Sequence, residues 1–354
     1  MIEIDGGEGS GSGTIVRLAV SLSTILGEEL RLTNIRAKRD KRGLRAQHRQ
    51  VVTACAEMCD GEAERAAIGS SEMTYRPGQR IRGGAYEWDI GTAGSTTMLA
   101  MSLLLIGGFA DKACSFTLKG GLFQDFAPSA HYMKGVLLPL LRRMGVDAEL
   151  SVRRPGYVPE GKGVLEVKVN PAKAGLRPLM LTDQGRVTGV RGIALSSHLA
   201  EQEVSDRMAE ECSTRLGEAG YDADIEAVYE SSASQKGADL SVWMETDSGA
   251  IIGADRAGKL GRRSEEIGRH VAESMLDDLK TGATVDRYLA DQLIPFCAVA
   301  NGASEYVMPN VTEHVETNLW LVERILGAET RLDGRRLSVE GVGDRLRASG
   351  WCGK

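Results

Sequence analysis

The chain has 354 residues, 42% of them hydrophobic and 26% charged, and a formal net charge of -6. This length is more than one compact core usually supports, so it predicts two domains or a repeated architecture. The net negative charge argues against a protein that coats DNA without regard to sequence, although it leaves room for a local basic site.

The six cysteines are scattered, and two of them, Cys55 and Cys59, stand four residues apart where they would share one helix face. A metal or redox pair is one reading, and small buried thiols are the commoner one. The chain has no CxxC and no signal peptide, which favours a reducing cytoplasm. The most apolar stretch, LAMSLLLIGGFA, is too short to span a membrane. We therefore expect a cytoplasmic protein without membrane association and without a DNA partner.

The N-terminal stretch DGGEGSGSGTIVR places five glycines and two serines ahead of a helix that begins near Thr14. Such a loop lets backbone N–H groups and the helix dipole approach a phosphate, but a tight turn between strand and helix explains it equally well. Arg17 in the first helical turn favours the phosphate, because a cation is unfavourable there unless an anion is near.

The strongest cluster of charge is RAKRDKRGLRAQHRQ, residues 36–50, in which seven cations face a single Asp40. The seven are Arg36, Lys38, Arg39, Lys41, Arg42, Arg45 and Arg49. A solvated loop is the plain interpretation, and a clamp for phosphates is the functional one, because the guanidinium fork suits oxyanions. A weaker basic patch runs from Arg256 to Arg263.

A pattern of elements recurs three times along the chain. In each copy a histidine precedes an apolar helix that ends at a glycine, and a strand-like run comes before it. The pairs are His48 and Gly61, His131 and Gly145, and His314 and Gly327. With an earlier helix in each copy, the unit reads helix, strand, helix, strand, and such self-similarity predicts a fold built from repeats.

The pattern changes between the second and third copies. Residues 182–275 read as one strand, one amphipathic helix within HLAEQEVSDRMAEECSTRLGEAG, and further strands. This predicts a small α+β domain at 182–275, inserted into a repeat-built domain formed by 1–181 and 276–354.

Polar residues then interrupt an apolar helix in RYLADQLIPF. Tyr288, Asp291 and Gln292 are spaced by three and four residues, so they share one face. On a side that faces the core they would need partners or a ligand, whereas a solvent-facing edge needs neither.

Five segments together carry a resemblance to a known family: RAKRDKRGLRAQH, GTAGS, RPGYVPEGKG, ATVDRYLADQL and HVETN, in this order. They resemble the RNA 3'-terminal phosphate cyclases over essentially the whole chain. The resemblance implies an α/β (α+β) fold, with a threefold repeat of βαβαββ units and a small inserted α+β domain.

The resemblance also implies a reaction, an ATP-dependent nucleotidyl transfer of the ligase type. His314, with Thr317 and Asn318 completing an H-x-x-T-N motif, would attack the α-phosphate of ATP and carry AMP covalently. Neutral imidazole is a competent nucleophile near pH 7. The AMP would pass to an RNA 3'-phosphate, and the vicinal 2'-hydroxyl would then expel it to leave a 2',3'-cyclic phosphate.

By match to the family, further residues receive roles. Tyr288, Leu289, Ala290, Asp291 and Gln292 would line the nucleotide site together with Pro128. Arg17, Arg39 and Gln47 would hold the terminal phosphate or the RNA backbone. A divalent cation, Mg²⁺ or Mn²⁺, would offset charge on the leaving pyrophosphate, with Glu8 or Asp291 as its candidate ligand.

The chain departs from the family at three places. The family's acidic residue near the first helix falls on Ser10, a common glutamine falls on Met101, and Lys162 stands where a small residue is usual. The first two keep open an alternative function, that of a catalytically inactive, RNA-binding relative in ribosome assembly, although the retained H-x-x-T-N motif argues against it. An enolpyruvyl transferase, built from similar repeats, suits neither that motif nor the insert.

Overall fold

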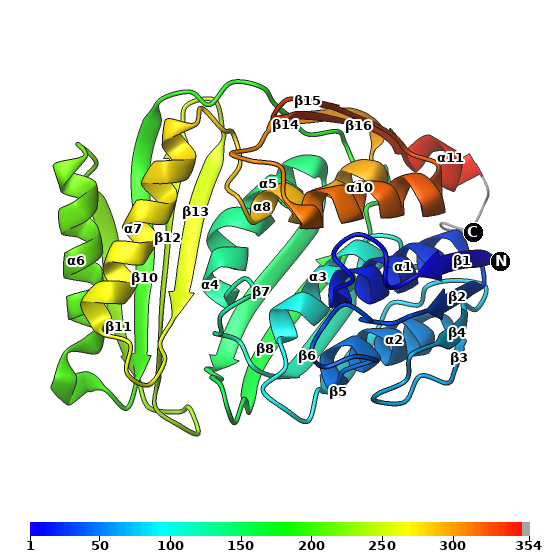
Figure 1. The fold of residues 1–354 in the computed structure, drawn as a ribbon, viewed down its shortest axis with the longest axis horizontal. Coiled ribbons are helices and arrows are strands. Elements are labelled where there is room, and N and C mark those ends of the chain that lie inside the picture. The colour runs from blue at the N-terminus through cyan, green and yellow to red at the C-terminus, as the bar shows by residue number, and fades with distance from the viewer. Residues whose placement is uncertain (349–354) are drawn as a thin grey trace.

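The computed structural model describes residues 1–348, which form a mixed α/β protein of four small sheets and the helices packed on them (Figure 1). Among these residues the cysteines are free, buried thiols, which confirms the plainer reading of Cys55 and Cys59. Cys352 lies outside the described residues. Within the described part of the chain, no helix is both long and apolar enough to cross a membrane.

The first sheet has the strand order β1-β2-β4-β3, and its helices α1 and α2 follow the first and second strands. Strands β1 and β2 are parallel, whereas β2 with β4 and β4 with β3 are antiparallel. The elements are β1 (Ile2–Asp5), α1 (Gly13–Leu26), β2 (Leu30–Thr33), α2 (Ala46–Cys59), β3 (Glu62–Glu64) and β4 (Met73–Arg76).

The second sheet repeats this arrangement with the order β5-β6-β8-β7 and the same strand directions. Its second crossover is one continuous helical segment with a π-helical turn, η1, in the middle. The elements are β5 (Ala85–Asp89), α3 (Thr96–Gly107), β6 (Cys114–Gly120), α4 (Ala130–Tyr132), η1 (Met133–Leu137), α5 (Leu138–Met144), β7 (Asp147–Arg154) and β8 (Gly163–Asn170).

In the third sheet, β15-β16-β14-β9, the two strands that come first in the chain, β9 and β14, are again parallel, and the other two pairs are antiparallel. We propose that the three sheets are three copies of one βαβαββ unit. The elements are β9 (Met180–Leu181), α8 (Leu289–Gln292), α9 (Ile294–Ala298), β14 (Asn301–Val307), α10 (Glu313–Leu326), β15 (Glu329–Asp333) and β16 (Arg336–Val342), followed by α11 (Gly343–Ala348).

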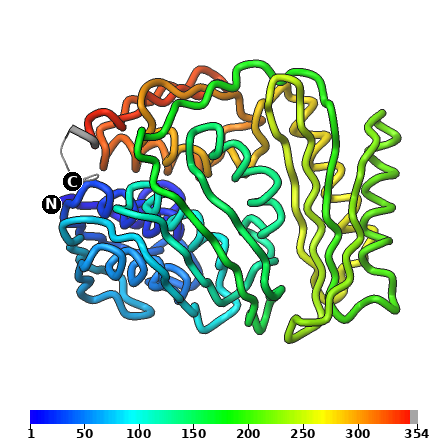
Figure 2. Tube along the Cα trace, turned by 180° about the vertical axis from the view of Figure 1, so that it is seen from behind, coloured from blue at the N-terminus to red at the C-terminus, as the bar shows by residue number. Residues whose placement is uncertain are grey.

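The fourth sheet, β11-β10-β12-β13, lies between β9 and α8 in the chain and forms one end of the molecule (Figures 1 and 2). Helices α6 and α7 pack on it around a hydrophobic cluster of its own. The elements are β10 (Val187–Ser197), η2 (Ala200–Gln202), α6 (Val204–Glu218), β11 (Ala223–Glu230), β12 (Gly237–Thr246), β13 (Ile251–Ala257) and α7 (Ser264–Lys280).

Helix α7 extends the unit beyond the border expected from the sequence. We propose that this sheet and its two helices are the inserted domain, but residue 275 falls inside α7, which continues to Lys280. Ile267, Val271 and Met275 of α7 are buried in the cluster at four-residue steps, a spacing that the sequence analysis overlooked. The domain therefore includes two long helices rather than one.

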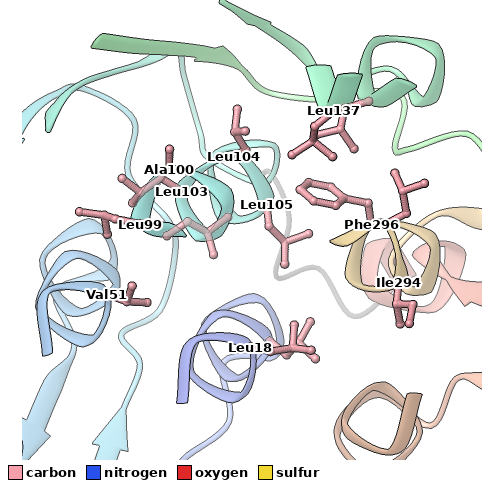
Figure 3. Close-up of a cluster of buried hydrophobic side chains, with 14 of the residues drawn as sticks. Leu18, Val51, Leu99, Ala100, Leu103, Leu104, Leu105, Leu137, Ile294 and Phe296 are labelled. Carbon is pink, nitrogen blue, oxygen red and sulfur yellow. The ribbon is translucent and has the colours of Figure 1, made fainter. Parts of the chain in front are cut away.

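Helices that pack beside the first three sheets meet in one central core (Figure 3). Helix α3 lies in its middle and is apolar almost all round, as expected for a helix surrounded by others. Val51 of α2 and Phe296 of α9 extend into the core from either side of this helix, and Leu18 of α1 extends toward the side where Ile294 lies. Each such side chain contributes about 1.5–3 kcal/mol when fully buried, so this core fixes how the units sit around the helices.

The apolar helix predicted around RYLADQLIPF is wrong in one respect, because it is broken into α8 and α9. Pro295 occupies the first turn of α9, where its missing N–H is no loss, but it cannot continue a helix that begins earlier. Tyr288 stands just before α8 and is 46% exposed. The segment is therefore two short helices, preceded by a half-exposed tyrosine, rather than one buried helix.

Candidate active site

A cavity of about 540 Å³ opens where the helices beside the first three sheets and strand β13 of the fourth sheet come together. Helices α1, α2, α3, α4, α8, α9 and α10 contribute to its wall, as do strand β13, the loop residues Arg36 and Arg39, and the loop 124–128. Eight residues expected at a phosphate or nucleotide site line this cavity: Arg17, Arg39, Gln47, Pro128, Tyr288, Asp291, Gln292 and His314.

Three residues expected at the site lie elsewhere. Leu289 and Ala290 are fully buried in the hydrophobic core and do not line the cavity. Glu8 is exposed in the glycine-rich loop, also away from the lining. Within residues 1–348, no group of three or more His, Cys, Asp or Glu side chains is arranged to hold a metal ion.

His314 is the second residue of α10, whose first turn is capped by Thr312: its hydroxyl accepts a hydrogen bond from the N–H of Val315 at 3.2 Å. Partial burial lowers the pKa of the His314 imidazole, and the charges of Arg39 and Arg17 lower it further. The ring is therefore neutral near pH 7 and able to act as a nucleophile.

Thr317 and Asn318 of α10 form hydrogen bonds with the glycine-rich loop, with the start of α1 and with α8. The N–H of Ser10 donates to the Thr317 hydroxyl at 2.9 Å, and the Thr14 hydroxyl donates to the Asn318 carbonyl oxygen at 3.4 Å. The Asn318 amide in turn donates to the backbone carbonyl of Asp291 at 2.9 Å. These two side chains thus fix the glycine-rich loop and α8 against α10.

Three arginines of the cavity wall, Arg17, Arg36 and Arg39, form no ion pair within residues 1–348. Burial lowers the pKa of Arg17 to about 10, and among the described residues no carboxylate lies within 4.0 Å of it. Burial raises the pKa of Asp291 to about 7, an effect that the nearby Arg17 opposes. The buried Nε of Arg39 has no hydrogen-bond partner. Such a set of donors favours an anion in the cavity.

His48, which sequence reasoning did not assign to the site, also lines the cavity. Its side chain is buried, and its pKa lies well below the ordinary value because of desolvation and the charges of Arg17, Arg36 and Arg45. Its Nδ1 has no hydrogen-bond partner. The ring is therefore neutral and belongs to the wall of the cavity.

Strand β13 of the fourth sheet supplies further lining residues, among them Asp255 and Arg256. Arg256 belongs to the weaker basic patch, which was a usable signal, whereas no pattern in the sequence marks Asp255. Burial raises the pKa of Asp255 to about 7. Both residues reach the site only because the fourth sheet packs against α4 and η1.

The loop 124–128 is anchored to the fourth sheet on both sides. Arg262 donates two hydrogen bonds to the carboxylate of Asp125, at 3.0 and 2.9 Å. Just after the loop, the N–H of Ser129 donates to Asp255 at 2.5 Å, and the hydroxyls of Ser129 and Ser241 lie 2.6 Å apart. The fourth sheet therefore sets the position of this wall of the cavity.

The three departures from the expected pattern have different surroundings. Ser10 is buried, does not line the cavity, and has its hydroxyl 3.0 Å from that of Ser12. Met101 lies on α3 and does line the cavity. Lys162 is exposed with a left-handed backbone, φ 54°, where a glycine is easily accommodated, and it pairs with Glu160 at 2.8 Å.

Comparison with known proteins agrees with the expectation from the motifs. Residues 8–332 match the family model described as "RNA 3'-terminal phosphate cyclase". A protein of that name from Methanopyrus kandleri is 38% identical over 343 residues, covering 95% of this chain and 96% of the relative. One from Archaeoglobus fulgidus is 36% identical, covering 96% of this chain and 100% of the relative. The chain therefore belongs to the RNA 3'-terminal phosphate cyclase family and is an enzyme of that family.

Proposed function

We propose that this enzyme converts an RNA 3'-phosphate to a 2',3'-cyclic phosphate at the expense of ATP, through AMP bound covalently to His314. The observation that carries the proposal is the setting of His314: a neutral imidazole faces a cavity lined by Arg17, Arg36 and Arg39, three arginines that form no ion pair within residues 1–348. An uncharged nucleophile surrounded by fixed positive charge suits attack on a polyphosphate.

In the first step, an imidazole nitrogen of His314 attacks the α-phosphorus of ATP. A phosphorus–nitrogen bond forms as the bond from that phosphorus to the pyrophosphate oxygen breaks. Arg17 and Arg39 neutralise phosphate charge during this displacement, which needs positioning and charge stabilisation rather than a strong base. Tyr288 and Pro128 on the cavity wall offer an aromatic and an apolar surface for the adenine.

In the second step, an oxygen of the RNA 3'-phosphate attacks the adenylate phosphorus and frees His314. The vicinal 2'-hydroxyl then attacks the activated 3'-phosphorus, AMP leaves, and the hydroxyl proton passes to solvent. The side chain of Gln47 is held in place, since its carbonyl accepts a hydrogen bond from the N–H of Ser95 at 3.0 Å and its amide nitrogen lies 3.4 Å from Nε2 of His48. The second N–H of that amide is the one that would contact the phosphate.

A divalent cation fits this site only in part. Of the two candidate ligands, Asp291 lines the cavity and Glu8 does not. Mg²⁺ is commonly held by one or two carboxylates together with substrate phosphates, and a single carboxylate beside a triphosphate meets that need. We propose Asp291 as the protein ligand; the ion would supply further neutralisation of phosphate charge.

The alternative of an inactive relative in ribosome assembly is not favoured. A protein without the reaction has no need for a histidine in the cavity with its motif partners, Thr317 and Asn318, hydrogen-bonded behind it. We also propose that the enzyme acts in the cytoplasm, on RNA that ends in a 3'-phosphate.

The test is the intact mass of the purified protein after incubation with ATP and Mg²⁺ or Mn²⁺. We expect the wild type to gain the mass of one AMP group and His314→Ala to gain none. His270→Ala, which removes a histidine of α7 outside the cavity, is the matched control and should load like the wild type. No gain by the wild type with either metal would refute the covalent mechanism.

A further inference from the structure

The exposed position of Phe126 is not explained by a contribution to the stability of the fold. It lines the cavity, yet its side chain is 100% exposed, so it lies at the mouth and gains nothing from burial. Its backbone has φ 67°, in the left-handed region that costs a bulky residue about 1–2 kcal/mol. Exposed apolar surface and an unfavourable backbone together point to a role in binding.

The loop holds Phe126 in place rather than leaving it free. Immediately before it, Asp125 is fixed by the two hydrogen bonds from Arg262. Three residues after it, Ser129 is fixed by Asp255 and Ser241. The chain on both sides of Phe126 is therefore fixed, and this holds the residue at the mouth before a ligand binds, which lowers the entropic cost of binding.

We propose that Phe126 stacks on the nucleobase of the RNA 3'-terminal nucleotide while the phosphate of that nucleotide lies among Arg17 and Arg39. This rests on the proposed function. ATP can be enclosed by the cavity, but an RNA chain must leave it, so the last base lies at the mouth. Exposed aromatic rings bind single-stranded RNA by stacking, which every base allows, so the subsite accepts any terminal base.

The test compares wild type and Phe126→Ala on two short RNAs that end in a 3'-phosphate, one with a normal terminal base and one whose terminal ribose lacks a base. With the normal RNA we expect kcat/KM for cyclisation to fall about 5- to 150-fold, the range given by base–aromatic stacking energies, chiefly through KM. With the abasic RNA the two proteins should be equal. Phe126→Tyr should restore the wild-type value.

Leu260→Ala is the matched control. Leu260 is also fully exposed, at 103%, in the neighbouring loop that contains Arg262, but it does not line the cavity. It should leave both substrates unaffected. AMP loading without RNA separates the two nucleotides: Phe126→Ala should load normally.

Three results would overturn the assignment. An equal loss on both RNAs would show that Phe126 acts through the shape of the loop, and impaired AMP loading would show that it stacks on ATP. Unchanged cyclisation of the normal RNA would show that it binds neither. A wild type that forms no AMP adduct would instead refute the proposed function, and the stacking with it, before any variant is compared.

Discussion

Burial and two neighbouring arginines together set the protonation state of His314. Partial burial disfavours the imidazolium, and Arg39 and Arg17 disfavour it further, while Glu313 favours it. The net effect lowers the pKa below the ordinary 6.5. The same arginines that would hold phosphate therefore also keep the nucleophile free of its proton.

The first prediction follows from this coupling. Arg39→Ala removes a positive charge near His314, so the pKa of the imidazole should rise. Only the neutral ring attacks. As the pH is lowered, the rate of AMP loading should therefore begin to fall at a higher pH in the variant than in the wild type. The measurement is the loading rate by intact mass between about pH 5 and 8.

The control for this prediction lies in the same basic segment. Arg49 is exposed and does not line the cavity, so Arg49→Ala should keep the wild-type midpoint. Loss of Arg39 as a phosphate ligand would lower the plateau at every pH. Only a shifted midpoint reports the imidazole, and a midpoint that stays fixed would contradict the coupling.

At the scale of elements, the approach of α1 to α2 depends on a glycine. A Cβ added at Gly13, the first residue of α1, would lie 1.9 Å from Nε2 of His48 on α2. The two helices can be this close only because no side chain stands there. The same contact sets where the His48 ring borders the cavity.

The second prediction is that Gly13→Ala lowers the free energy of unfolding by about 1–3 kcal/mol, the usual cost of overpacking, and slows AMP loading because His48 is displaced. Gly217→Ala is the control, since a Cβ at this site in α6 meets nothing within 4 Å. Alanine there should be neutral or stabilise by about 0.5–1 kcal/mol. Urea unfolding of both variants gives the comparison, and equal values would contradict it.

Elements with strong periodicity could be predicted from the sequence, and interrupted ones could not. The helix that carries His314 follows from its apolar spacing and its glycine stop, and the structure ends α10 just before Gly327. The segment RYLADQLIPF, residues 287–296, was predicted as one helix because its composition is apolar, but it is divided before Pro295. Apolar composition alone does not reveal such a break.

The candidate site shows a similar limit. Residues within the recognisable segments, such as Arg39 and Asp291, do line the cavity. Leu289 and Ala290 do not, because successive residues of a helix turn by about 100° and five in a row cannot face one side. Asp255 belongs to strand β13, far from these segments in the sequence, and it reaches the cavity through tertiary packing. No local spacing in the sequence predicts such a contact.

At the scale of the whole molecule, charge is distributed unevenly. The formal net charge is -6, yet within residues 1–348 none of the seven cations at 36–49 forms an ion pair. Elsewhere arginines are commonly paired, as Arg76 is with Glu29. A polyanion therefore meets a positive region beside the cavity on a protein that is negative overall, and local charge matters more here than the total.

The last prediction tests that region with salt. Binding of RNA that ends in a 3'-phosphate should weaken as salt rises, because each neutralised phosphate releases counterions, with a slope of about 0.7 per contact for single strands in a plot of log affinity against log salt. Arg42 is exposed, unpaired among the described residues and outside the cavity lining. Arg42→Ala should therefore reduce the slope by about one contact while AMP loading without RNA stays at the wild-type rate. Arg324→Ala, which removes an exposed cation from the last turn of α10, should leave the slope unchanged. If both variants changed the slope equally, the affinity would report net charge, and the segment 36–49 would have no special part in holding RNA.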